Sequence, residues 1–148
     1  DERHRDALMK HLSVLRNTGK MTIWHDGLVE PGTDREGMIY SQMGVAQLLV
    51  LLISSDYLDE LYCTGLMTAI EAERERWTIL PVRVRRVDYD DTFLKRLAQL
   101  PANGQPVTGW QDPDDAWTDV AVGVRTVIES LRDQAYALLP PHHSGRPS

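Results

Sequence analysis

Four side chains that can contact a ligand stand where predicted strands end. Trp24 closes a short β-prone run, and Asp26 follows it two residues later. Ser54 and Tyr57 come directly after an aliphatic run. In open α/β sheets, ligands bind at the carboxyl ends of the strands, where an aromatic ring can stack and a carboxylate or hydroxyl can hydrogen-bond. Each residue also has a structural alternative. Trp24 can pack in the core and Asp26 can form a turn. Ser54 can cap a helix, and Tyr57 can pack its ring.

The composition describes a single acidic domain. The chain has 148 residues, and 16 Lys and Arg against 22 Asp and Glu give a net charge of −6. This acidity argues against a nucleic-acid partner, which requires a basic face. Hydrophobic residues make up 42% of the chain, enough for a core. Cys63 and the pair His142-His143 supply too few ligands for a metal site, so none is predicted.

The apolar segments are too short for a membrane protein. The longest apolar run, residues 45–53, is well below the ~20 residues that a spanning helix needs. The first residues are charged and do not resemble a signal peptide. One cysteine excludes an internal disulfide framework and fits a reducing compartment. We therefore expect a cytoplasmic protein without membrane contact.

Hydrophobic periodicity predicts alternating helices and strands. Residues 48–53 are aliphatic without interruption, which is typical of a strand covered on both faces. Thr33 and Glu36 form the pattern of a capping box. Gly65 is unfavourable within a helix, which predicts a bend there. Pro81 predicts an interruption or an edge position in its strand. The expected helices are residues 1–17, 33–43, 56–76, 90–100 and 112–131, and the expected strands are residues 21–24, 48–53, 78–84 and 106–110.

This alternation predicts an α/β fold with helices on both faces of a parallel sheet. Doubly wound units usually open with a strand, whereas this chain opens with a helix, so we expect a first strand upstream of Asp1. Residues 25–32 are predicted to form a loop, because Pro and Gly interrupt them.

An ordered set of short motifs resembles a known family. The motifs are His25-Asp26, Pro31-Gly32, Ser54-Ser55-Asp56-Tyr57-Leu58, Tyr62-Cys63, Leu80-Pro81-Val82, Leu100-Pro101 and Pro106-Val107-Thr108. In this order and spacing they resemble a bacterial Toll/interleukin-1 receptor (TIR) domain, over roughly residues 1–135. The resemblance implies a flavodoxin-like three-layer sandwich with a central parallel sheet. It implies a TIR domain over residues 1–139 and a tail, residues 140–148, leading to a sensor or oligomerisation module.

The resemblance also implies an activity. Many such domains hydrolyse or cyclise NAD, their substrate, with no further cofactor, and the transition state resembles an oxocarbenium ion. A glutamate in the third helix stabilises this charge. Here the expected positions hold Leu66 and Met67, and the next glutamate is Glu71, one helical turn beyond Met67. Either Glu71 takes the catalytic role, or the catalytic residue is missing and Glu71 lies on a solvated face. Glu60 is a weaker candidate.

Two functions follow from this resemblance. The first is an NAD glycohydrolase or cyclase in antiphage defence, switched on when copies associate through the 25–32 loop. Glu71 is then catalytic, and Trp24, Asp26, Ser54 and Tyr57 bind NAD. The alternative is a non-catalytic scaffold that associates through the same loop, and the apolar residues at positions 66 and 67 favour it.

Overall fold

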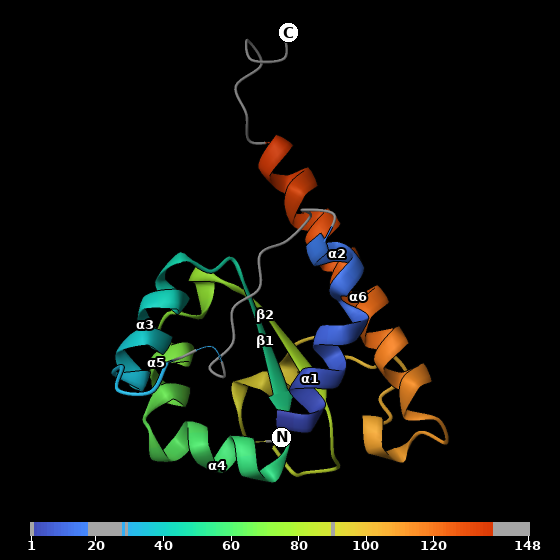
Figure 1. Cartoon of the computed structure of the whole chain (residues 1–148), viewed down its shortest axis with the longest axis horizontal. Coiled ribbons are helices and arrows are strands. Elements are labelled where there is room, and N and C mark those ends of the chain that lie inside the picture. The colour runs from blue at the N-terminus through green and yellow to red at the C-terminus, as the bar shows by residue number, and fades with distance from the viewer. Residues whose placement is uncertain (1, 18–27, 29, 90, 138–148) are drawn as a thin grey trace, which may run out of the picture.

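The computed structural model describes residues 2–17, 28, 30–89 and 91–137 (Figure 1). The predicted strand of residues 21–24 and the predicted tail of residues 140–148 lie outside this part. Of the predicted 25–32 loop, residues 28 and 30–32 are described, and the Leu28 side chain is 55% exposed. Within the described residues, no helix combines the length and the apolar character that crossing a membrane requires.

Two parallel strands form the centre of the fold. Strand β1 (Leu48–Ile53) pairs with β2 (Thr78–Arg83) in a register that runs from Leu48↔Thr78 to Ile53↔Arg83. Both strands were predicted within a residue of these bounds. Side chains alternate between the two faces of a sheet, so this register places Leu52 beside Val82 on one face and Leu51 beside Pro81 on the other.

Pro81 lies where its missing N–H is not needed by β1. The backbone N–H groups of Thr78 and Val84 donate to Gln47 and Ile53, on the β1 side. By alternation, the nitrogen of Pro81 faces the other side of β2. There Leu100 donates its N–H to the Pro81 carbonyl (3.0 Å) and no β1 bond is lost. The predicted edge-type position of Pro81 is therefore confirmed.

Helices pack on both faces of this pair, which gives an α/β arrangement (Figure 1). On one face Val82 packs with Leu8 of α1 (Glu2–His11) and Val120 of α6 (Pro113–Ala137). On the other face Ile53 packs with Leu61 of α4 (Ser55–Cys63). The remaining helices are α2 (Ser13–Asn17), α3 (Arg35–Val45) and α5 (Leu66–Ala72). The start of α6 was predicted, and the Asp112 carboxylate there accepts a hydrogen bond from the Asp114 N–H at 2.9 Å.

The predicted helix of residues 56–76 is divided at Gly65. This residue has a φ of +76°, and its N–H donates to the Tyr62 carbonyl at 3.2 Å. The chain resumes as α5 and then as the 3-10 turn η2 (Arg74–Arg76). A left-handed conformation suits glycine and stops a continuous helix. The predicted bend is therefore a complete break. Glu71 lies on the separate helix α5 and not on a continuation of α4.

Other predicted elements also differ from the structure. The expected helix at 90–100 is only the 3-10 turn η3 (Phe93–Arg96), and the expected strand at 106–110 is the 3-10 turn η4 (Val107–Gly109). In the latter segment a single backbone bond, from Thr108 N–H to the Val84 carbonyl (3.0 Å), reaches toward β2. The cap of α3 is Asp34, whose carboxylate accepts from the Gly37 N–H at 3.2 Å, and not the predicted Thr33.

His4 is a buried polar residue between α1, α6 and the segment after β2. It is 8% exposed, its ring lies 6.1 Å from the Trp117 ring, and its Nε2 lies 3.3 Å from Nη2 of Arg85. A guanidinium only donates hydrogen bonds, so His4 Nε2 must accept and the imidazole is neutral. Burial, followed by the positive charges of Arg85 and Arg3, lowers the pKa of His4 below its ordinary value of 6.5.

Replacing Gly65 tests the break between α4 and α5. No atom lies within 4 Å of the position where a Cβ would stand, so only backbone strain opposes a side chain. We expect Gly65→Ala to lower the free energy of unfolding by about 1 to 2 kcal/mol. Gly65→Asn should cost less, because asparagine tolerates this conformation. Denaturant unfolding measures both, and an alanine variant as stable as the wild type would contradict the assigned backbone.

Stability should also depend on the protonation of His4. Its pKa is lower in the folded chain than in the unfolded chain, so the unfolded chain binds more protons between the two values. The free energy of unfolding should therefore fall as the pH drops from neutral through 6.5. The His4→Gln variant should lose this component. Urea unfolding of both proteins across this pH range is the measurement, and parallel profiles would refute the buried neutral imidazole.

Candidate functional site

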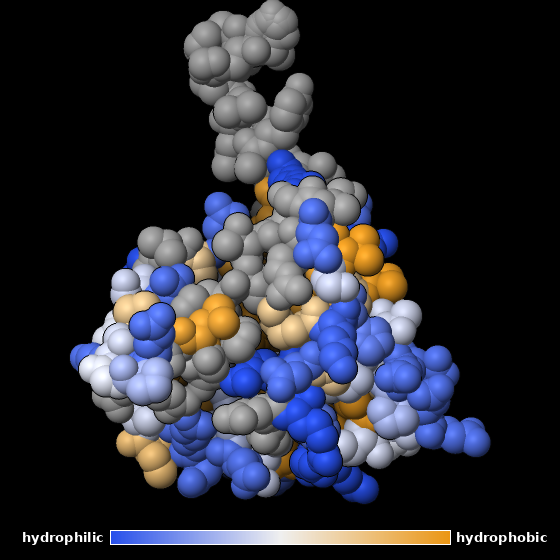
Figure 2. All heavy atoms as spheres, in the orientation of Figure 1, coloured by the Kyte–Doolittle hydropathy of each residue, from blue (hydrophilic) through white to orange (hydrophobic). Residues whose placement is uncertain are grey.

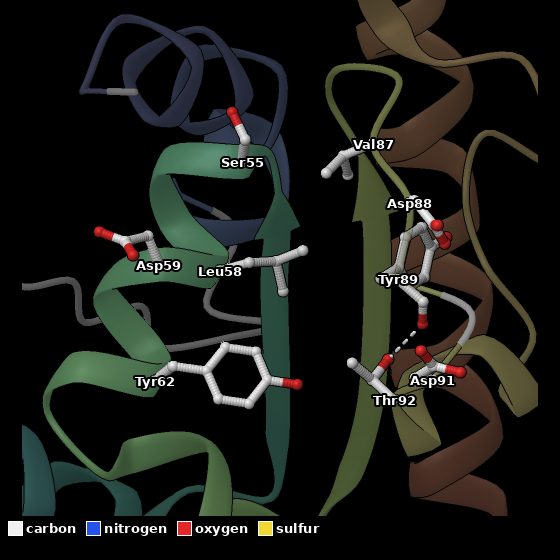
Figure 3. A pocket seen from close by; sticks show the side chains of 9 residues that line it. All are labelled: Ser55, Leu58, Asp59, Tyr62, Val87, Asp88, Tyr89, Asp91 and Thr92. Carbon is white, nitrogen blue, oxygen red and sulfur yellow. Dashed lines mark hydrogen bonds between the residues drawn. The ribbon is translucent and has the colours of Figure 1, made fainter.

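An open hollow of about 410 Å³ lies between α4 and the segment that follows β2 (Figure 3). Both of its walls belong to segments that directly follow the carboxyl ends of the two strands. Ligands bind at this end of the strands in open α/β sheets. The lining side chains are Ser55, Leu58, Asp59, Tyr62, Val87, Asp88, Tyr89, Asp91 and Thr92.

The first wall is one face of α4. Its lining residues recur at positions 55, 58, 59 and 62, the spacing of a single helical face. Leu58 is buried and anchors this face, whereas Tyr62 is 56% exposed. Figure 3 shows Tyr62 extending toward the 87–92 segment, while the Asp59 carboxylate turns to the other side of the helix. The thiol of Cys63 lies 3.9 Å from Oδ1 of Asp59. The wall therefore presents an aromatic ring with a carboxylate beside it.

The second wall is a segment held in place by Tyr89. This side chain is buried, and its hydroxyl donates a hydrogen bond to the Gln99 side chain. The Tyr89 carbonyl accepts hydrogen bonds from the Thr92 N–H (3.0 Å) and hydroxyl (2.7 Å). The Lys95 ammonium lies 5.2 Å from the centre of the Tyr89 ring, within cation–π range. These contacts fix the backbone that carries the other carboxylates of the hollow.

The hollow is acidic and partly aromatic. Among the residues that the structure describes, three aspartates line it, Asp59, Asp88 and Asp91, and no lysine or arginine does. Carboxylate oxygens accept hydrogen bonds from hydroxyl groups and attract positive charge, and the exposed Tyr62 ring offers a stacking surface. Within the described residues, no three His, Cys, Asp or Glu side chains are grouped as metal ligands. The arrangement suits an organic group that carries hydroxyls or positive charge.

Two residues predicted to bind a ligand have structural contacts here. Ser54 is 1% exposed and caps α4, its hydroxyl accepting from the Tyr57 N–H at 3.2 Å. Tyr57 is half-buried and packs against the core cluster that contains Ile53. Neither residue lines the hollow. Trp24 and Asp26, the other two predicted binding residues, lie outside the part of the chain that the structure describes.

Glu71 is exposed near the end of α5. Its backbone carbonyl accepts a hydrogen bond from Arg74 Nη1 at 3.2 Å. Glu71 lines neither the acidic hollow nor a smaller one of about 180 Å³, whose lining includes Arg74. Met67, one turn earlier, is buried, and Leu66 packs at the edge of the same core. The structure therefore does not bring Glu71 together with Ser54 or Tyr57 in one cavity.

Three residues that line the acidic hollow, Ser55, Leu58 and Tyr62, belong to motifs that carry the family resemblance, but none of them was predicted to bind a ligand. The carboxylates of Asp59, Asp88 and Asp91 belong to no motif noted in the sequence. Only their position in the sequence could have indicated a site. Each lies a short distance along the chain after the carboxyl end of a predicted strand, where α/β sheets bind ligands. Asp91 falls within the expected helix of residues 90–100, whereas Asp88 comes just before it.

Comparison with known proteins gives one informative likeness. The chain is 31% identical over 144 residues to Uncharacterized protein y4lF of Sinorhizobium fredii (strain NBRC 101917 / NGR234). The match covers 95% of this chain and 44% of that protein, so the chain spans less than half the length of this relative. No family model and no solved structure matches the chain.

Proposed function

We propose that this chain is a TIR-type domain that cleaves NAD at the nicotinamide–ribose bond when copies associate. The proposal includes the finer fold, a flavodoxin-like three-layer sandwich with further parallel strands beside the described pair. The observation that supports it most is the acidic hollow at the carboxyl ends of β1 and β2. A group with hydroxyls and developing positive charge is the complement of such a hollow, and the ribose of NAD has both.

In this reaction the bond between nicotinamide and ribose C1′ breaks, and the electron pair leaves with the neutral nicotinamide. The ribose becomes cationic and is captured by water, with loss of a proton, or by a nucleophile within the same molecule. The carboxylate of Asp91, and that of Asp59 after its side chain rotates toward the hollow, would accept hydrogen bonds from the ribose hydroxyls and stabilise the cation. Tyr62 would cover one face of the bound nucleoside. No acid is needed for a leaving group that departs neutral.

The exposed position of Glu71 determines how association between copies of the chain would complete a catalytic site. Glu71 is exposed on a single chain and lines neither of the two hollows found in the described residues, so we infer that it serves as the catalytic carboxylate only if a second copy encloses it. The acidic hollow is open on a single chain, so association would also be needed to exclude water from it. In either case residues of two copies would complete the site. A sensor or oligomerisation module is the further partner that we propose, and it would bring the copies together.

Two observations favour a non-catalytic scaffold as the second candidate. The two positions where the resemblance places a glutamate hold Leu66, which packs at the edge of the core, and Met67, which is buried in it. Leu28, within the predicted association loop, exposes a large apolar side chain. In the scaffold function this side chain would be part of the contact between copies. In this case the domain would associate and recruit a partner without consuming NAD.

Nicotinamide release by a clustered protein separates these functions. The chain, fused to a multivalent carrier, is incubated with NAD and the products are separated by chromatography. We expect release to require clustering, and Asp59→Asn and Asp91→Asn each to reduce it by roughly 100-fold, the usual effect of removing one transition-state-stabilising group. Asp56→Asn is the matched control, because Asp56 lies on the same helix but does not line the hollow.

Glu71→Gln, with Glu75→Gln as its control, assigns the catalytic carboxylate. Loss of release in Glu71→Gln alone would move the site to α5 and refute the role of the acidic hollow. If well-formed assemblies of the wild type release no nicotinamide, the scaffold function is correct and the enzymatic proposal is wrong.

A further inference from the structure

The smaller hollow, of about 180 Å³, combines an apolar lining with one arginine. Its lining side chains are Arg74, Trp77, Ile79, Phe93 and Leu97. They come from η2 and the residue after it, from the start of β2, and from η3 and the residue after it. Trp77 directly precedes β2, so this hollow lies near the amino end of that strand, whereas the acidic hollow lies beyond its carboxyl end. The two hollows share no lining residue.

The two aromatic side chains of this hollow are held in place by other parts of the fold. Trp77 is 9% exposed, and its indole N–H donates to the Met43 carbonyl at 2.8 Å. Phe93 is buried in the core cluster that contains Ile53. Side chains that are already ordered lose little entropy when a ligand binds. The aromatic part of the lining is therefore preformed.

Arg74 is the one charged side chain among the described residues that line this hollow. Its Nη1 donates to the Glu71 carbonyl at 3.2 Å, which orients the guanidinium near the end of α5. The neighbouring Arg76 is paired, because its Nη1 lies 3.1 Å from a carboxylate oxygen of Glu73. In the described part of the chain Arg74 has no such ion pair. Arg74 is exposed, so its other N–H groups can donate to a carboxylate at the mouth of the hollow.

The size and the lining of the hollow limit the ligand to one ring. Sites for drug-sized ligands measure about 300 to 1,000 Å³. An apolar cavity of about 150 Å³ with aliphatic and aromatic lining holds one benzene molecule. Tryptophan and phenylalanine pack against a further ring by offset stacking or edge-to-face contact. Since one guanidinium matches one carboxylate, the complement of this hollow is a single aromatic ring that carries one carboxylate.

The surroundings of the hollow favour a small ligand over a protein partner. Residues 73–76 are all charged and exposed, whereas charged side chains are depleted at the centres of protein interfaces. None of the large hydrophobic side chains that are exposed in the described ranges lines this hollow. Figure 2 shows hydrophobic side chains gathered beside α6, where Val122 is 55% exposed. That helix packs on the Val82 face of the strand pair, whereas Phe93 packs on the Ile53 face.

We propose that this hollow binds a small aromatic carboxylate. The ring would lie against Trp77 and Phe93, and the carboxylate would accept paired hydrogen bonds from the Arg74 guanidinium. The aliphatic side chains of Ile79 and Leu97 would contact the rest of the ring. The site is separate from the acidic hollow, so the proposal does not depend on NAD cleavage or on association between copies.

NMR titration of the isotopically labelled full chain with sodium benzoate tests this site. We expect saturable shifts of the Trp77 indole N–H and of the amides of Phe93 and Leu97, because the bound ring would lie against these residues. Arg74→Gln should weaken benzoate binding about tenfold, the effect of losing one charge-assisted contact. Arg96→Gln is the matched control and should leave the affinity unchanged, because Arg96 is exposed and does not line the hollow.

Benzyl alcohol, which has the same ring without the charge, is the second probe. It should bind the wild type about tenfold more weakly than benzoate does, and Arg74→Gln should leave its affinity unchanged. Equal affinity of the wild type for both probes, equal weakening by Arg96→Gln, or no saturable shift of the Trp77 indole N–H would overturn the proposal. Tighter binding of a tripeptide that ends in phenylalanine than of benzoate would also overturn it, because the hollow would then bind a protein terminus.

Discussion

The fold depends on burying both faces of one parallel strand pair. The register between β1 and β2 places Leu52 and Val82 toward α1 and α6, and places Leu51 and Ile53 toward α4 and α5. Apolar side chains therefore occupy both faces, and polar groups are confined to the ends of the strands and to the segments that follow. This constraint is the physical reason that the acidic hollow lies beyond the carboxyl ends of the two strands.

Polar groups differ between the two sides of this edge. The carboxylates of the hollow come from α4 and from residues 87–92, on the side of the core that contains Ile53. On the other side Arg85 contacts His4, which lies against Trp117 of α6. The acidic hollow and the buried histidine therefore belong to opposite faces of the strand pair.

The sequence predicted the elements whose signals are local. The aliphatic run of residues 48–53 and the capped start of α6 both have the predicted bounds to within a residue or two, because burial and capping are encoded in neighbouring residues. The 106–110 segment was predicted as a strand, but tertiary packing with Val84 and a turn closed at Gly109 produce η4 instead. The residues that line the hollow could not be predicted, because α4 and the 87–92 segment come from separate parts of the sequence and face each other only in the folded chain.

The most direct measurement is an NMR titration of the isotopically labelled chain with ADP-ribose, the product that retains the ribose and diphosphate of NAD. The account predicts that the amide resonances that shift most belong to the segments 55–62 and 87–92, whose side chains line the acidic hollow. Shifts centred on α5 around Glu71, or no saturable shifts at any residue, would contradict the placement of the ligand at the carboxyl edge of the sheet.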